Sequence, residues 1–297
     1  MIRVLGERLT QGVVQASGVL SVLTVLSWLI PPAAFLLSGT PAALVTLRRG
    51  PRIGLQVIAG SAVLLLGISA LAGLGPELTT GYVVGIWAPA WLCAAVLRYT
   101  ESQALMLLSA GMFGMCAVIA THLWLGDVTL WWQSTLSAWL KTSVTPELAQ
   151  QYANALEPAL PLINALMISA LVVSIGLTVL AGRWWQARLF NPGVFRLEFH
   201  GLRLPRVLVV PTAMAIGLLV FGAGPWQAVV RDLLVVMLFV YLFQGIAAAH
   251  RTVAKRGLSR GWLYMMYSLL ILVPHMLLFL SCLGMADSLA GGEARSG

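Results

Sequence analysis

Apolar runs long enough to cross a lipid bilayer recur along this chain and restrict the folds open to it. Residues 53–74, 102–125, 159–182 and 229–249 each approach the about 20 apolar residues that a membrane-spanning helix needs. Only 9% of the residues are charged, whereas soluble proteins carry about 25%. We therefore expect an all-α, polytopic transmembrane helix bundle that forms a single integral membrane domain over residues 1–297.

The breaks between the apolar runs predict eight to nine crossings. Pro31 and Pro32 divide the first apolar stretch, because proline cannot continue a helix, so that this stretch forms either a hairpin or one crossing. With the hairpin, the chain crosses nine times. The expected spans are 13–30, 33–47, 53–74, 81–97, 102–125, 159–182, 207–222, 229–249 and 261–283.

The segment 183–206 carries five arginines and is expected to be a basic cytoplasmic loop, because basic loops stay on the cytoplasmic side. This orientation places the N-terminus inside and the C-terminus outside a bacterial inner (cytoplasmic) membrane. The segment 126–158 then becomes a periplasmic amphipathic segment, with several tryptophans at the interface. The net charge of +8 lies beside the spans and suits anionic lipid, so we expect no nucleic-acid partner.

Two basic loops are expected to form a cytoplasmic docking surface for lipid headgroups or for a cytoplasmic or membrane protein partner. In the second loop, Phe195, Phe199 and Leu202 recur at helical spacing after a turn, which predicts a short amphipathic helix. Arginine suits anionic headgroups and acidic partners alike. The docking residues predicted in the two loops are Arg48, Arg49, Arg52, Asn191, Pro192, Gly193, Arg196 and Arg203.

A few polar residues fall within the apolar runs, where an ionisable group is a candidate functional residue. Asp232 is either a solvated residue at a helix start or part of a polar cluster at the outer mouth of a cavity. His275 follows Pro274 in mid-span and is expected to share an interior with Asn164, whereas His122 is expected at the interface. The predicted ligand-binding residues are His275, Asn164, Gln244 and Asp232.

No enzyme motif stands out. HExxH, P-loop and GxSxG patterns are missing from the sequence, and each of these is a recognisable local signature of its chemistry. Cys93, Cys116 and Cys282 lie in apolar runs without CxxC spacing, which makes a thiolate metal site or a disulfide framework a poor interpretation. We expect no enzyme activity, metal or cofactor.

Three segments resemble a known family. Residues 39–54 (GTPAALVTLRRGPRIG), 191–205 (NPGVFRLEFHGLRLP) and 284–289 (GMADSL) are similar to signature segments of the YybS-like family of bacterial membrane proteins, although that family's basic tail is missing. The resemblance implies a fold related to the substrate-binding S components of energy-coupling-factor vitamin transporters and to the cell-shape protein MreD. Two functions follow: a transport-type protein that binds a small molecule, or a membrane scaffold of the MreD kind that docks envelope or signalling proteins.

Overall fold

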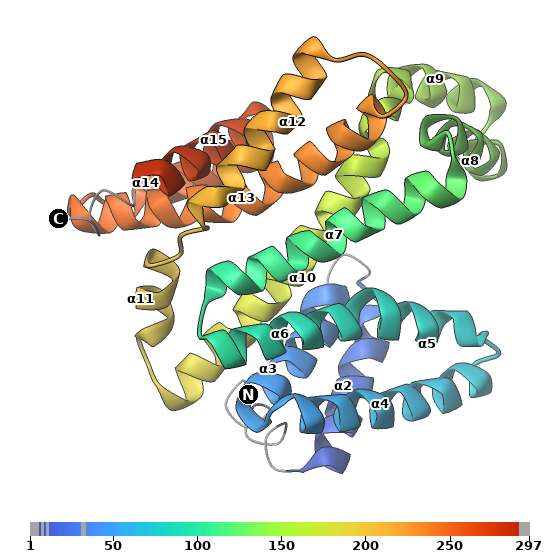
Figure 1. The fold of residues 1–297 in the computed structure, drawn as a ribbon. Coiled ribbons are helices and arrows are strands. Elements are labelled where there is room, and N and C mark those ends of the chain that lie inside the picture. The colour runs from blue at the N-terminus through green and yellow to red at the C-terminus, as the bar shows by residue number, and fades with distance from the viewer. Residues whose placement is uncertain (1–5, 7–8, 10–11, 31–33, 291–297) are drawn as a thin grey trace. The chain divides into compact units, whose positions relative to one another are not determined.

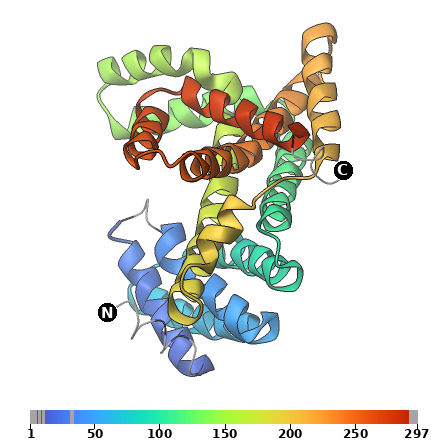
Figure 2. The same cartoon turned by 90° about the vertical axis from the view of Figure 1, so that its left-hand side faces the viewer.

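The computed structural model describes residues 6, 9, 12–30 and 34–290. In these residues the regular structure is entirely helical, without a β-strand, as two views at right angles show (Figures 1 and 2). The all-α prediction is therefore confirmed. The expected turn at Pro31 and Pro32 and the C-terminal residues after 290, on which the side of the C-terminus depends, lie outside the described residues.

The helices follow one another closely, with short connections. Proline is the first or second residue of several of them, where its missing N–H group leaves no intrahelical bond unmade. The order is α2 (Val13–Ser27), the π-helix η2 (Phe35–Gly39), α3 (Thr40–Arg49), α4 (Pro51–Leu71), α5 (Pro76–Tyr82), the π-helix η3 (Val83–Trp87), α6 (Ala88–Thr100), α7 (Gln103–Leu125), α8 (Val128–Ser143), α9 (Pro146–Leu156), the 3₁₀ turn η4 (Glu157–Ala159), α10 (Leu160–Phe190), α11 (Val194–His200), the 3₁₀ turn η5 (Arg206–Leu208), α12 (Val209–Phe221), α13 (Gln227–Lys255), α14 (Gly261–Leu272) and α15 (His275–Ala290).

Several helices are suited to a membrane by length and composition. Among the described residues, five are long and apolar enough to cross a bilayer: Pro51–Leu71, Pro76–Thr100, Gln103–Leu125, Pro146–Phe190 and Gln227–Lys255. Four further apolar helices are shorter, at 10–17 residues. The chain is thus a multi-pass helical membrane protein, and the structure does not confirm the predicted count of eight to nine crossings.

The expected span 261–283 is divided into two helices. Helix α14 ends at Leu272 and α15 begins at His275, with Pro274 between them. Proline lacks the N–H group that would continue the helical ladder and its ring crowds the preceding turn. The prediction of one continuous span here is wrong, because the break at Pro274 is complete rather than a local irregularity.

The segment 126–158 forms the two helices α8 and α9. Asp127 caps α8, and its Oδ1 accepts a hydrogen bond from the backbone N–H of Leu130 at 3.0 Å. Thr145 and Pro146 begin α9 as their sequence predicts, with Pro146 in the first turn. The amphipathic character of α9 leaves its polar side chains exposed, which agrees with a segment outside the apolar spans.

Internal contacts divide the chain into two compact units. Unit 1 comprises Met1–Ala110, Val173–Leu204 and Ile246–Met265. Unit 2 comprises Gly111–Val172, Pro205–Gly245 and Met266–Gly297. Four of the boundaries fall inside helices α7, α10, α13 and α14, and the fifth lies between α11 and η5. Each unit therefore contains parts of these four helices.

In unit 1, helices α2 to α6 form a bundle around an apolar core (Figure 1). Small residues bring α2 and α4 together. The Ser17 hydroxyl donates to the Val57 carbonyl at 3.1 Å, and the Ser61 hydroxyl donates back to the Ser17 carbonyl at 3.2 Å. Both serines are buried. Apolar side chains gain little from association within lipid, so close backbone approach and such interhelical hydrogen bonds hold membrane helices together.

Helix α11 is attached to α10 in unit 1 by an ion pair. The Arg183 guanidinium donates to both carboxylate oxygens of Glu198, with Nε 2.9 Å from Oε2. The Gln103 side-chain amide also donates to Glu198 at 3.4 Å. Phe195 and Phe199 stack with ring centroids 6.1 Å apart. The short helix predicted in this loop is therefore confirmed, and a bidentate pair, the stronger kind of ion pair, fixes its position.

In unit 2, α13 and α15 approach each other through glycines. Backbone atoms of the partner helix lie so near to Gly245 and Gly284 that a Cβ atom on either would overlap a carbonyl oxygen, of Leu280 and Tyr241 respectively. The Ser281 hydroxyl also donates across the contact, to the Leu238 carbonyl at 2.7 Å. Helix α12 lies beside α15 in both views (Figures 1 and 2).

Candidate functional site

A buried carboxylate is the centre of the candidate site in unit 2. Asp232, on the second turn of α13, is 1% exposed. Its Oδ2 accepts a hydrogen bond from the Asn164 amide at 2.8 Å and lies 2.9 Å from Nε2 of His122. The Asn164 amide also donates to the Thr121 hydroxyl at 3.3 Å. Helices α7, α10 and α13 thus each bring a polar side chain to one point, which we call the Asp232 cluster.

Local sequence explains how Asp232 becomes buried so near the beginning of its helix. The Gln227 side-chain amide donates to the Gly222 carbonyl at 2.7 Å, which closes the loop before α13. The neighbouring Arg231 forms a longer ion pair with the carboxylate: its Nε lies 3.4 Å from Asp232 Oδ1, and its Nη2 donates to the same oxygen at 3.5 Å. His122 and Asn164 are therefore the closer partners of the carboxylate.

Burial makes the cluster costly unless its members stay paired. An ionised carboxylate without partners in an apolar environment is strongly disfavoured, and polar residues within membrane helices usually face the protein interior. His122 is 11% exposed, compared with 1% for Asp232. The cluster is thus partly exposed on its histidine side and buried on its carboxylate side.

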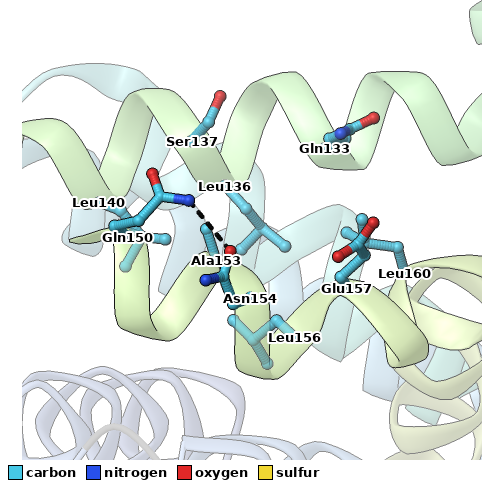
Figure 3. Close-up of a pocket in the computed structure, with 10 residues that line it drawn as sticks. All are labelled: Gln133, Leu136, Ser137, Leu140, Gln150, Ala153, Asn154, Leu156, Glu157 and Leu160. Carbon is cyan, nitrogen blue, oxygen red and sulfur yellow. Dashed lines mark hydrogen bonds between the residues drawn. The ribbon is translucent and has the colours of Figure 1, made fainter. Parts of the chain in front are cut away.

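A pocket of about 250 Å³ lies between α8 and α9 (Figure 3). Its polar groups are mostly uncharged. Gln150 and Asn154 are joined by a hydrogen bond of 3.0 Å on α9, and α8 presents Gln133 and Ser137 on the facing side. The residues that line the pocket are Gln133, Leu136, Ser137, Leu140, Gln150, Ala153, Asn154, Leu156, Glu157 and Leu160.

The pocket and the Asp232 cluster are linked by the first turn of α10. Leu160 lines the pocket, and Asn164 follows it by four residues on the same helix. Side chains four apart lie on one face of a helix, separated by about 6 Å along the axis. Both sites belong to unit 2. One turn of α10 therefore separates a residue of the pocket from a residue of the Asp232 cluster.

The predicted ligand residues do not form a single group. Asn164 and Asp232 meet, as described, which excludes the interpretation of Asp232 as a solvated residue at a helix start. Gln244 lies in a second buried cluster, where its amide donates to Asp287 at 2.9 Å and accepts from the Ser288 hydroxyl at 2.8 Å. Gln244 thus links α13 to α15 by side-chain hydrogen bonds, which help to hold membrane helices together.

His275 departs from its prediction. It is the first residue of α15 and is exposed, and the expectation that it shares an interior with Asn164 is wrong. The reason is the complete break at Pro274, which places His275 at a helix end instead of in mid-span. His122, which was expected at the interface, is instead only 11% exposed and lies against Asp232.

The predicted docking residues lie in unit 1, where the ends of α3 and α10 meet. The Arg48 guanidinium covers the Phe190 ring at 4.0 Å from its centroid, directly before the turn of Asn191, Pro192 and Gly193. The Gln186 amide donates to the Leu47 carbonyl at 3.3 Å. Arg52, Arg196 and Arg203 are exposed, and Arg49 is partly buried. The two motifs are therefore brought together, as their placement beside the same expected membrane face predicts.

Sequence reasoning missed His122 as a partner of Asp232. A signal was present in the expected spans, because His122, Asn164 and Asp232 each lie within about one turn of the outer end of a span. Three polar residues at the same depth can meet when their helices are neighbours, whereas a residue in mid-span cannot reach them. The depth of a polar residue within its expected span is therefore a better guide to its partners than its ionisable character alone.

Comparison with known proteins places the chain in a family. No curated protein and no solved structure matches it. A family model described as "Predicted membrane protein (DUF2232)" matches residues 18–288, which include the Asp232 cluster, the pocket and both basic loops. The likeness to S components and to MreD stays a prediction. Because the match covers nearly the whole chain, this multi-pass helical protein belongs to the DUF2232 family of predicted membrane proteins.

Proposed function

We propose that this protein is a transport-type membrane protein that binds a small polar solute, in the manner of the S components of vitamin uptake systems. The observation that carries the proposal is the Asp232 cluster, a buried carboxylate paired with His122, Asn164 and Arg231. Asn164 of this cluster lies one turn of α10 from Leu160, which lines the pocket. Polar groups buried in membrane helices are functional candidates by default. A solute enters the α8–α9 pocket, and its polar groups then replace some of the hydrogen bonds within the cluster.

The shape and chemistry of the pocket suit a small solute. Its volume, about 250 Å³, is near the lower end of ligand pockets, which range over roughly 300–1,000 Å³. Amides and hydroxyls on α8 and α9 offer both donors and acceptors. In the expected orientation this pocket faces the periplasm of a bacterial inner membrane, which suits uptake.

Replacing Asp232 by asparagine tests the proposal. We expect native mass spectrometry of the protein, purified in mild detergent, to detect a bound small molecule in the wild type and little of it in Asp232→Asn. Asp287→Asn is the matched control, since it makes the same change in the Gln244 cluster of the same unit. A ligand retained equally in both variants, or no ligand in the wild type after incubation with periplasmic extract, contradicts the proposal.

Filling the pocket provides a second test of the same function. Ala153 lines the pocket and Ala155, on the same helix, is exposed and does not line it. We expect Ala153→Trp to reduce ligand occupancy at least tenfold, because the indole occupies the space, and Ala155→Trp to leave occupancy unchanged. Equal occupancy in the two variants would show that the ligand bypasses the pocket.

A scaffold of the MreD kind is the second candidate, favoured by the joined ends of α3 and α10. Arg52 is exposed beside the Arg48–Phe190 contact, and such a surface can dock an acidic protein. Arg52→Glu is expected to lower the yield of a cross-linked partner several-fold in cells, while Asp287→Asn leaves it unchanged. An unchanged yield in Arg52→Glu would contradict the scaffold function.

A further inference from the structure

A second pocket, in unit 1, has a markedly basic lining. It lies between α11, the last turns of α13 and the beginning of α14, and its volume is about 470 Å³. Two arginines and two histidines supply its polar groups, and none of its lining residues is acidic. The lining residues are Arg196, His200, His250, Val253, Ala254, Gly257, Leu258, Arg260 and Leu263. We call it the basic pocket.

The walls of the basic pocket are held in place by contacts on both helices. The Arg251 guanidinium donates to the backbone carbonyl of His200 at 2.8 Å. The edge of the His250 ring meets the face of Phe199, with centroids 5.6 Å apart and planes at 88°. Arg196 and His200 are four residues apart on α11 and share one face of it. The basic groups are thus positioned before any ligand arrives.

We propose that the basic pocket binds a phosphate group, carried by an anionic membrane lipid or free in solution. Arginine guanidinium groups bind phosphate oxygens through paired, charge-assisted hydrogen bonds, and the two histidines add further donors. The apolar side chains of Val253, Leu258 and Leu263 form the rest of the lining, which suits the glycerol and acyl parts of a lipid. This site is independent of the solute site proposed in unit 2.

The protonation of His200 adds a pH dependence to this site. Burial lowers the pKa of His200 below its usual value of 6.5, and the positive charges of Arg196 and Arg251 lower it further. His250 and Arg260 also face the pocket. His200 is therefore neutral at pH 7.5, and a bound phosphate favours its protonation. Phosphate binding is expected to strengthen as the pH falls through the lowered pKa.

Native mass spectrometry with added lipid tests the proposal on the full chain in mild detergent. Arg196→Gln/Arg260→Gln is expected to weaken binding of phosphatidylglycerol at least about tenfold, since two charge-assisted hydrogen bonds are lost. The matched control is Lys255→Gln/Arg256→Gln, which removes the same charge from exposed residues that do not line the pocket. Equal weakening in both double variants would show a general charge effect and overturn the proposal.

Two further measurements extend the test. Binding of inorganic phosphate distinguishes the source of the phosphate group, and a variant that keeps the charge separates loss of binding from loss of folding. Inorganic phosphate that binds as well as the lipid, with the same loss in the pocket variant, identifies a free anion; binding of the lipid alone identifies a headgroup. Arg196→Lys/Arg260→Lys, which keeps the charge, is expected to retain more binding than the glutamine variant. Phosphatidylglycerol, a diester, does not titrate near neutral pH, so a pH dependence that persists in His200→Gln/His250→Gln would show that the histidines of the pocket do not take part in binding.

Discussion

Replacing Gly245 by alanine is expected to destabilise the protein by about 1–3 kcal/mol, the usual effect of forcing extra volume into a packed contact. A Cβ atom at Gly245 overlaps the carbonyl oxygen of Leu280, and backbone atoms cannot rotate aside as a side chain can. Helices α13 and α15 must therefore separate, which also lengthens the hydrogen bond from Ser281 to Leu238. Thermal unfolding in detergent or titration with a denaturing detergent measures the loss.

Gly217 provides the matched control for this prediction. It lies in α12 of the same unit, and a Cβ atom built on it meets nothing within 4 Å. Alanine is favoured over glycine in a helix by about 0.5–1 kcal/mol, so Gly217→Ala is expected to leave stability unchanged or to raise it. If Gly245→Ala proved as stable as Gly217→Ala, the close contact between α13 and α15 would be wrong.

Replacing His122 by leucine is expected to lower stability by about 1–3 kcal/mol, because the buried Asp232 then loses one of its two closest partners and keeps Asn164 and the longer contact with Arg231. Asp232→Asn is expected to destabilise the wild type, since it weakens the pairing with His122. In the His122→Leu background the same change removes the poorly paired charge. There we expect it to be neutral or stabilising.

This reversal of sign is measured as a double-mutant cycle. Residues that share a hydrogen-bonding network show coupling energies of about 0.5–3 kcal/mol, whereas independent sites add within about 0.5 kcal/mol. Gln244 belongs to the other cluster, where its side chain is hydrogen-bonded to Asp287 and Ser288. The pair Asp232→Asn and Gln244→Leu is therefore the additive control. Additivity of His122→Leu with Asp232→Asn would contradict the geometry of the Asp232 cluster.

The class of the protein followed from the sequence because it depends on properties that are summed along the chain. Runs of about 20 apolar residues and few charges leave a helical membrane protein as the fold. Local signals also located the α9 start at Pro146, since the effect of proline on its own turn needs no tertiary context. The prediction of helix α11 also depends on local sequence alone, because the spacing of Phe195 and Phe199 defines one face of a helix.

The effect of Pro274 was underestimated from the sequence. A proline within an apolar run either kinks a membrane helix or ends it, and neighbouring helices decide which, because they can satisfy the freed backbone groups. In this structure the helix ends, and α15 starts anew at His275. The prediction that His275 shares an interior with Asn164 was wrong because it assumed a continuous span.

Only the tertiary structure decided which polar residues meet. Asp232 lies 68 positions after Asn164 and 110 after His122. Hydropathy gives the depth of each residue in the membrane but not the neighbour of its helix or the direction of its side chain. The same holds for the basic pocket, where α11 and the end of α13 bring Arg196 and His250 together. Helix neighbours are set by close packing at glycines and by interhelical hydrogen bonds, and those depend on the three-dimensional match of two surfaces.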